Sequence, residues 1–518
     1  MEIWDYINIL RKSEKSSFLN EANAIDEKIN AIEFIKSNGN HSLISELIPS
    51  IKSNSPAIRN KTLEVIKLFY KKISSGKHLY QSLKYCQISK QDLDFFKYNL
   101  PEEDYLVLVS IATYNFDGYV REKAIDEISN FSHNEKILKP LLDRLSDWVK
   151  INRDKATKIV TDLKRLSNLQ YFIGQIHTIE KLKQVNRTDL TDIYNELVKF
   201  IIEEHKSQVL SNFDSYPDKK RILLARLIIE SYSLEMNDLK IFISDKNFLV
   251  RSLALKRFDL LGNDEINSLL KDKSSKIRLQ TLYALEKNEN ISNIVYEFLA
   301  DTSASIRNFA RFILKNENID FKEMYSKNLL QNQQIEGSLY GLKEMDGKEY
   351  INEIIPFLNS NVIKIVKAAF STTKEFEPKI AYNFALNNIN SDSIGVRKIS
   401  VEYLYKNPTS EVIEKARTLF HSNNLHLRKA MLKLFSKIGK YKCLDEILNG
   451  TIDENKDIRI LSNAYLKEWI AKSNKYFISP TQNEIKLIKQ SIEKIKNQLK
   501  DDDYITIKTL KEIEFHIR

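Results

Sequence analysis

One pattern decides the fold, and it occurs in DKNFLVRSLALKRF (residues 245–258), DKSSKIRLQTLYAL (272–285) and DTSASIRNFARFIL (301–314). In each segment an Asp is followed six residues later by an Arg, and the Arg has an apolar residue directly before it. A small or polar residue stands three positions after the Arg, and a large apolar residue seven positions after it. The three arginines are 27 and then 29 residues apart. A self-similar unit of this length predicts a solenoid of helical hairpins, each packed on its neighbours.

The pattern extends in both directions from this stretch. Apolar–Arg pairs recur, with Asn152 in place of the apolar residue once and a Lys in place of the Arg once; the positions are Arg59, Arg121, Arg153, Lys367, Arg397, Arg428 and Arg459. Residues 165–240 lack the pattern and form the least regular part. We therefore predict N-terminal repeats in 1–164, an irregular region or bend in 165–240, a regular array in 241–475 and capping helices in 476–518. In the last segment, Thr481 and Glu484 predict a capping box at a helix start.

The recurring spacing of Asp and Arg within the unit has a physical explanation. A carboxylate in the turn before a helix accepts hydrogen bonds from free backbone N–H groups. An Arg in the first turn of that helix can bond the Asp of its own unit or of the neighbouring unit, which would give a ladder along the stack. The predicted ladder residues are Asp245, Arg251, Asp272, Arg278, Asp301, Arg307, Asp392, Arg397, Arg428, Asp453 and Arg459.

The composition agrees with an all-helical protein whose surface is exposed to water. Only 11 Gly and 9 Pro occur in 518 residues, fewer than β folds or glycine-rich phosphate loops need. The two cysteines do not form a disulfide framework or a Cys-x-x-Cys metal motif. Signal-peptide features and an apolar run of about 20 residues are both missing, so we predict a cytoplasmic protein without a membrane partner.

The chain resembles HEAT-repeat proteins of the short-repeat type found in many bacterial proteins and in phycobilin lyase subunits. The resemblance rests on the Asp–Arg spacing and covers most of residues 40–470. It implies an all-α, right-handed superhelix of about 30-residue hairpins, with the second helices on the concave side. It does not imply one function, because such arrays serve as scaffolds, nucleic-acid binders and occasional enzymes.

A basic segment is the candidate for nucleic-acid binding. Residues 52–97 contain ten Lys or Arg against three acidic residues, with aromatic residues interspersed. Lysines could contact phosphates while tyrosines stack on bases. The candidates are Lys71, Lys72, Lys77, Lys84, Tyr70 and Tyr80; alternatively the aromatics belong to the core and the lysines are merely solvated. A second basic stretch covers residues 150–165, and the formal net charge of the chain is +10.

No catalytic signature is present in the sequence. It lacks a phosphate loop, an HExxH metal motif, a nucleophile elbow and a dinucleotide fingerprint. His421 and His426 are close together but have no ligand-like partners, so surface histidines are expected. We predict no catalytic residue, no metal and no cofactor.

Three functions remain open, and the first is favoured. It is a non-enzymatic scaffold that binds a protein partner along the concave face. The alternative is a nucleic-acid-binding protein, similar to the HEAT-like alkylpurine DNA glycosylases. A lower alternative is an activity like that of bilin lyases. The sequence does not specify the oligomeric state.

Overall fold

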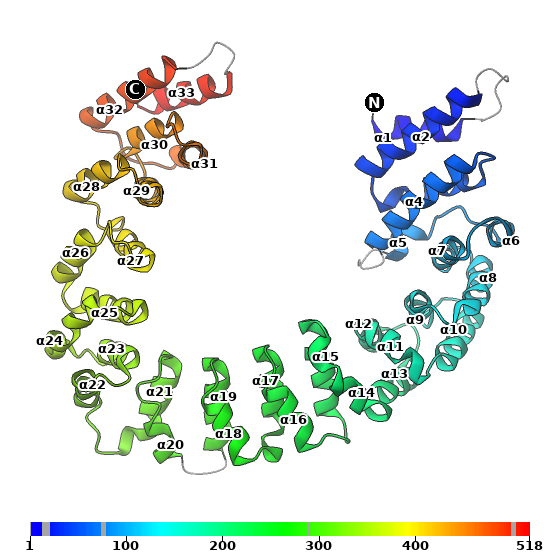
Figure 1. Cartoon of the computed structure of the whole chain (residues 1–518), viewed down its shortest axis with the longest axis horizontal. Coiled ribbons are helices and arrows are strands. Elements are labelled where there is room, and N and C mark those ends of the chain that lie inside the picture. The colour runs from blue at the N-terminus through cyan, green and yellow to red at the C-terminus, as the bar shows by residue number, and fades with distance from the viewer. Residues whose placement is uncertain (1, 13–20, 74–78, 288–290, 499–503, 518) are drawn as a thin grey trace. The chain divides into compact units, whose positions relative to one another are not determined.

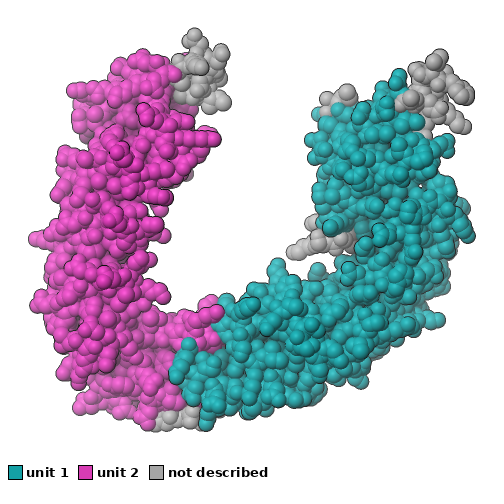
Figure 2. All heavy atoms as spheres, in the orientation of Figure 1, with its two compact units in different colours: residues 1–271 teal, residues 272–518 magenta. Residues whose placement is uncertain are grey.

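The computed structural model describes residues 2–12, 21–73, 79–287, 291–498 and 504–517, and these residues form helices joined by turns (Figure 1). No strand occurs in these ranges. The chain divides into two compact units, residues 1–271 and 272–518 (Figure 2). In the described ranges no helix is both long enough and apolar enough to span a membrane.

Unit 1 begins with long helices and continues with shorter ones that alternate in direction. Its helices are α1 (Ile3–Arg11), α2 (Glu21–Asn38), α3 (Ile44–Leu47), α4 (Pro56–Ile73), α5 (Leu79–Leu83), α6 (Lys90–Asn99), α7 (Glu102–Ala112), α8 (Gly118–Ile128), α9 (Leu138–Arg144), α10 (Lys150–Asp162), α11 (Leu169–Gly174), α12 (Ile176–Glu180), α13 (Thr191–Lys199), α14 (Lys206–Ser211), α15 (Asp218–Glu230), α16 (Met236–Ile243), α17 (Phe248–Ala254) and α18 (Asn263–Leu270). Short 3-10 segments and one π-helical turn, Phe200–Glu204, lie between them.

Unit 2 is the more regular of the two. Its helices are α19 (Ser275–Glu286), α20 (Ser292–Tyr296), α21 (Ala304–Ile313), α22 (Phe321–Leu330), α23 (Ile335–Glu344), α24 (Ile351–Ile354), α25 (Ile363–Phe376), α26 (Pro378–Asn387), α27 (Ile394–Leu404), α28 (Ser410–Phe420), α29 (Leu425–Ile438), α30 (Leu444–Thr451), α31 (Lys456–Ser473), α32 (Gln482–Lys496) and α33 (Tyr504–His516). Within this unit α22, α24, α26 and α28 form an outer layer, and α23, α25, α27 and α29 line the inner side (Figure 1).

Helix α29 shows why the motif produces this packing. The Asn424 side chain accepts hydrogen bonds from the first free N–H groups and starts the helix. Leu427, Met431 and Phe435, at positions −1, +3 and +7 relative to the Arg, are buried on one face. Gly439, with φ of +66°, ends the helix in a conformation that favours glycine. The motif positions therefore define the core-facing side of each second helix.

Small residues at position +3 allow neighbouring helices to approach closely. Ser462 holds this position in α31 and is fully buried. A Cβ added at Gly450 of α30 would lie 2.1 Å from the Ser462 hydroxyl, so both residues must stay small. Each unit has a continuous apolar core built from such contacts. The prediction of an all-α, HEAT-type solenoid of helical hairpins is confirmed.

Two local predictions concern the irregular region and the C-terminal end. Residues 165–240 form short helices, from α11 to the start of α16, and no long loop. Thr481 and Glu484 form the predicted capping box at the start of α32. The division into four segments derived from the sequence stays a prediction.

Candidate partner-binding groove

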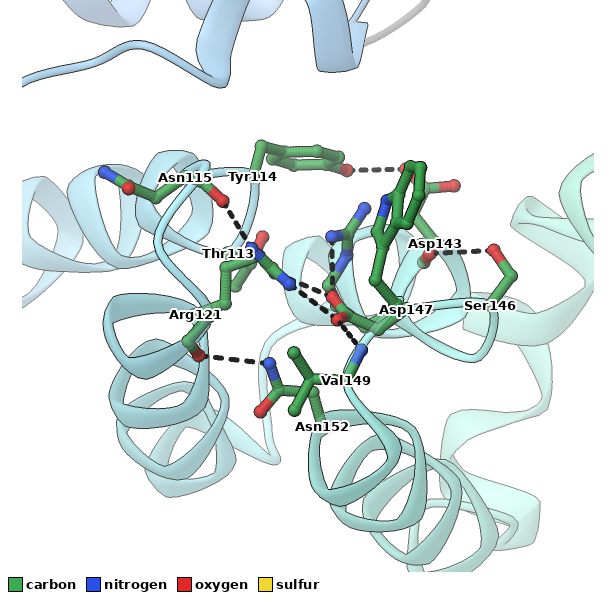
Figure 3. Close-up of polar contacts among 12 residues, drawn as sticks. Thr113, Tyr114, Asn115, Arg121, Asp143, Ser146, Asp147, Val149 and Asn152 are labelled. Carbon is green, nitrogen blue, oxygen red and sulfur yellow. Dashed lines mark hydrogen bonds and ion pairs between the residues drawn. The ribbon is translucent and has the colours of Figure 1, made fainter. Parts of the chain in front are cut away.

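The motif arginines connect successive turns, and Arg121 shows the geometry (Figure 3). Its Nη1 donates to the carbonyl oxygens of Asn115 and Phe116, both at 2.9 Å, in the turn before its own helix. Its Nε and Nη2 donate to the two carboxylate oxygens of Asp147, each at 2.7 Å, in the following turn. Asp147 also accepts from the Val149 N–H. One guanidinium group thus joins two turns of the stack.

The same bidentate contact to the following turn recurs in both units. Nε–carboxylate distances are 2.7 Å for Arg221–Asp245, 2.9 Å for Arg278–Asp301 and 3.1 Å for Arg307–Glu344. Arg428 pairs with Asp453 through Nη2. The sequence left open whether the Arg bonds the Asp of its own or the neighbouring unit. In the Asp pairs the carboxylate comes from the neighbouring turn, whereas Glu344 is the last residue of α23 in the neighbouring hairpin.

Within an arginine's own turn the contact is to the backbone carbonyl of the residue six positions earlier, whether that residue is Asp, Asn or Ser. Nη1 donates to the carbonyl oxygen six residues earlier in Arg59, Arg121, Arg153, Arg251, Arg278, Arg307, Arg397 and Arg459. Among the predicted members, Asp392 is exposed and pairs with no cation of the described chain, and Arg397 bonds the carbonyl of Ser391. Arg221 and Glu344 were not predicted, because their surroundings depart from the sequence pattern.

These arginines are buried, which bears on their role. Arg121 is 3% exposed and Arg307 is 2% exposed. Burial by itself raises the pKa of the Asp147 carboxyl, but hydrogen bonds from Arg121 and the Val149 N–H, with the charge of Arg144, hold it below its ordinary value. Groups that are buried and already paired are poorly placed to receive phosphates. The geometry therefore favours a structural role for this series.

The predicted nucleic-acid residues are spread over different environments. Lys71 and Lys72 are exposed at the end of α4, and the Lys84 Nζ lies 4.5 Å from the ring centre of Tyr85. Tyr70 packs against the core, and burial raises the pKa of its hydroxyl above the ordinary value. Lys77 and the side chain of Tyr80 lie outside the described residues.

Many lysines of the basic segments are neutralised by neighbouring helices. Lys67, Lys97 and Lys155 each have a carboxylate oxygen 2.6–3.0 Å from the ammonium group. Lys52, Lys61 and Lys164 also form ion pairs. The partner carboxylates include Asp104 for Lys67 and Glu127 for Lys97. A cluster of basic residues in the sequence is therefore a much weaker positive patch in the fold.

A groove on the inner side of unit 2 differs from these segments. It lies between α27 and α29 and has a volume of about 380 Å³. Its floor is apolar, with Ile394, Val401, Tyr405 and Ala430. Its charged lining consists of Arg397, Lys398, Lys406, Lys433 and Lys437, with His426 and the single carboxylate Glu402 among the described lining residues. We call this the α27–α29 groove.

The lysines of the α27–α29 groove form no ion pair within the described protein, although the charge of Lys437 contributes to lowering the pKa of Glu468. No carboxylate oxygen of the described residues lies within 4 Å of the ammonium groups of Lys398, Lys406, Lys433 and Lys437. By contrast, Lys429 on a neighbouring face of α29 lies 2.7 Å from Asp457. The groove thus combines uncompensated positive charge with an apolar floor, which suits an acidic ligand that also carries apolar groups.

The turn-to-turn carboxylate series is interrupted at this groove. Ser422 stands six residues before Arg428, where five other turns carry Asp, so the turn that follows Arg397 lacks that carboxylate, as the turns with Ser53 and Ser391 also do. In the described chain no carboxylate oxygen lies within 4 Å of the Arg397 guanidinium. Its charge adds to that of the groove lysines.

The sequence contains a signal for the groove that spacing alone did not reveal. Lys398 and Lys406 stand one and nine positions after Arg397, and Lys433 and Lys437 five and nine positions after Arg428. These positions lie on the helix faces turned away from the core. Comparing outward positions between successive units would have found the basic stripe.

No family model matches the sequence, and no curated protein is similar to it in sequence. Among solved structures, the karyopherin Kap121p bound to the SUMO protease Ulp1p aligns with 95% of this chain and 65% of its own, at 12% identity and a TM-score of 0.32. A C-terminal fragment of the Chaetomium thermophilum cohesin loader SCC2 aligns with 93% and 44%, at 12% identity and a TM-score of 0.29. The chain thus spans less than two thirds of either protein. Likeness at this level carries no information about function.

Proposed function

We propose that this chain is a non-enzymatic interaction scaffold, and that the α27–α29 groove binds an acidic segment of a protein partner that also carries apolar side chains. The observation that carries the proposal is the set of unneutralised cations around an apolar floor. Acidic side chains would pair with Lys433 and Lys437, while apolar side chains would cover Ile394 and Val401. The groove is formed by second helices, where a solenoid presents its extended binding surface.

The lining favours a protein segment over nucleic acid. Single-stranded nucleic acids bind through aromatic platforms on which successive bases stack. Tyr405 is the only aromatic residue among the described lining residues, and it is partly buried. Apolar floors with a charged rim are typical of protein–protein contacts.

The test measures fluorescence anisotropy of a labelled 12-residue peptide in which Glu and Leu alternate, with the full chain. A second peptide carries Gln in place of every Glu, and a labelled 12-nucleotide oligo(dT) tests the nucleic-acid explanation. Each lost contact to an exposed charge is worth about 1 kcal/mol or less. The change Lys433→Glu/Lys437→Glu adds repulsion to the loss of two contacts, so we expect at least about a tenfold loss of affinity for the Glu peptide.

The matched control is Lys327→Glu/Lys379→Glu, which changes the net charge equally but lies on α22 and α26 of the outer layer. We expect it to keep most of the affinity. Equal losses in both variants would mean that only net charge matters and would contradict a groove site. Tighter binding of oligo(dT) than of the Glu peptide, with the same dependence on the two groove lysines, would replace the protein partner by nucleic acid.

A second candidate function, nucleic-acid binding, is favoured by a separate feature of unit 1. Four aromatic side chains on three adjacent turn regions are each more than 60% exposed: Tyr85, Phe116, Tyr119 and Trp148. We call them the turn ridge. Cations lie over three of the rings, with distances to the ring centre of 4.5 Å for Lys84, 4.9 Å for Lys90 and 3.9 Å for Arg187. Exposed rings beside cations suit stacked bases and phosphates.

Binding of labelled oligo(dT) at two salt concentrations tests the turn ridge. Tyr119→Ala/Trp148→Ala removes two stacking platforms, and about 1–3 kcal/mol is expected from each base stack. Tyr232→Ala is the control, because Tyr232 is fully exposed but lies outside the ridge. Salt-independent binding, or equal loss in both variants, would remove this candidate.

A further inference from the structure

A second pocket lies in unit 2. It shares no described lining residue with the α27–α29 groove, although α29 contributes to both. It has a volume of about 720 Å³ and is formed by the end of α28, the following turn, the start of α29, α30 and α32. Most of its lining is polar, and Leu487 and Ile452 supply apolar surface. We call it the α30 pocket.

Two buried carboxylates share one guanidinium group in the α30 pocket. Arg417 Nη1 lies 2.6 Å from Asp445 Oδ2 and 2.9 Å from Glu446 Oε1, and its Nη2 donates to Asp445 Oδ1 at 2.9 Å. Asp445 is 3% exposed and Glu446 is 4% exposed. Burial, followed by the nearby charge of Asp445, raises the pKa of Glu446 above its ordinary value. The charges of Arg417 and, to a smaller extent, of His421 and Lys494 oppose this shift. The described lining holds four carboxylates against Arg417, Arg428 and Lys494, which leaves one formal negative charge with His421 neutral.

Oxygen atoms without a partner line the same pocket. Glu446 Oε2, Asn449 Oδ1 and Ser422 Oγ are shielded from solvent and accept no hydrogen bond from the described protein. All three residues line the α30 pocket. Buried polar atoms are normally satisfied, so such a group indicates a place where an external donor binds. The carboxylate and amide oxygens can only accept, and the complement must therefore donate.

We infer that the α30 pocket binds a primary ammonium group carried on an alkyl chain. An ammonium has three N–H donors and no acceptor, and it would supply the positive charge that the basic lining residues together leave unmatched. A metal ion is a poorer fit, because no group of three His, Cys, Asp or Glu in the described chain is placed to hold one. Leu487 and Ile452 would contact the methylene groups of the chain.

An alkylammonium group could come from a free polyamine or from a lysine side chain of a protein. The chemistry at Glu446 is the same in both cases. The inference does not depend on the α27–α29 groove, whose charge has the opposite sign. The Lys433→Glu/Lys437→Glu variant should therefore keep its response to amines.

The test follows the melting temperature Tm of the full chain as amine is added, because a ligand that binds the folded state raises Tm with its concentration. The probes are 1,5-diaminopentane, spermidine and Nα-acetyl-lysine N-methylamide, with choline as a cation that has no N–H donor. We expect the primary amines to raise Tm and choline to have no effect. A larger response to the lysine derivative would identify a protein lysine as the source, and a larger response to the diamine a free polyamine.

The decisive variant is Glu446→Gln, with Glu454→Gln on the exposed rim of the same pocket as its control. We expect Glu446→Gln to lose at least about tenfold in amine affinity and the control to keep it. If Glu446 had only a structural role, the Glu446→Gln variant would be less stable than the unchanged protein. Because the fold disfavours the ionised form, we expect its Tm without amine to be unchanged or higher. No Tm response to any amine, or an undiminished response in Glu446→Gln, would overturn the inference and leave the pocket oxygens to water.

Discussion

Replacing Asp147 by Asn tests whether the turn-to-turn arginine contacts hold the repeats together. Asp147 accepts two hydrogen bonds from Arg121 and one from Arg144, at 2.7–2.9 Å, and its side chain is fully buried. In the Asn variant both guanidinium groups lose their counter-charge, and the amide NH₂ would point a donor at other donors. Removing one partner from a buried ion pair costs about 3–5 kcal/mol.

Hydrogen exchange of the full chain, followed by mass spectrometry, measures this loss where it occurs. Local opening of α8 and α10 should become easier by the full amount, because Arg121 and Asp147 join their turns. A loss of 3–5 kcal/mol corresponds to exchange faster by about two to four orders of magnitude, at 1.4 kcal/mol per tenfold change. Peptides from α27 in unit 2 should exchange at the unchanged rate.

The control is Asp126→Asn, the same chemical change in the same repeat. Asp126 is exposed and lies 2.7 Å from Lys155, and an exposed pair of this kind contributes about 0.2–1 kcal/mol. Exchange in α8 and α10 should rise less than about tenfold. If Asp147→Asn changed exchange no more than Asp126→Asn does, the buried contacts would not be what stabilises the stack.

Two further predictions concern packing and pH. A Cβ on Gly337 would lie 1.7 Å from the carbonyl oxygen of Ala300, so Gly337→Ala should lower the free energy of unfolding by at least about 2 kcal/mol. Gly174→Ala is the control, because the new methyl group would have open space around it and should not lower this free energy. The midpoints of urea unfolding compare the two variants. The pKa values of Asp147 and Glu344 are lowered in the fold, so these carboxylates stabilise the folded protein only while they are ionised. The free energy of unfolding should therefore be constant above about pH 5 and fall below it. A rise on acidification would contradict this.

The sequence predicts the core more completely than it predicts the partners of the core's charged groups. Residues at −1, +3 and +7 around the motif arginines are buried as the helical period requires, except Phe258 and Val396, which are partly buried. The carboxylate partner depends on how one turn lies over the next, and this is not written in the spacing. Arg221 has Ser215 and Lys220 where the pattern expects an Asp and an apolar residue, yet it binds Asp245 in the same manner.

The candidate groove was harder to predict, because its residues are defined by what surrounds them. Lys67 and Lys433 look alike in the sequence, but Asp104 lies beside the first and no carboxylate of the described chain lies beside the second. Ion pairing between neighbouring hairpins removed much of the positive charge that the N-terminal composition suggested. A binding surface emerges where such pairing is missing.

The charge of the α27–α29 groove comes in part from Arg397, which has no carboxylate partner in the described chain. Arg59, Arg153 and Arg459 also bond only backbone carbonyls there, so the outward lysines are what distinguish the groove. Where Asp147, Asp245 or Asp301 occupies the following turn, the guanidinium charge is neutralised inside the stack. Ser422 occupies that position after Arg397, so this unit keeps its charge, and the outward lysines of α27 and α29 add to it. A repeat whose arginines all pair with carboxylates would be held together at both of its turns, but it would attract an acidic ligand less strongly. A missing internal carboxylate, together with the outward lysines, thus gives this unit a surface that attracts acidic groups, and the Arg428–Asp453 pair still joins α29 to the next turn.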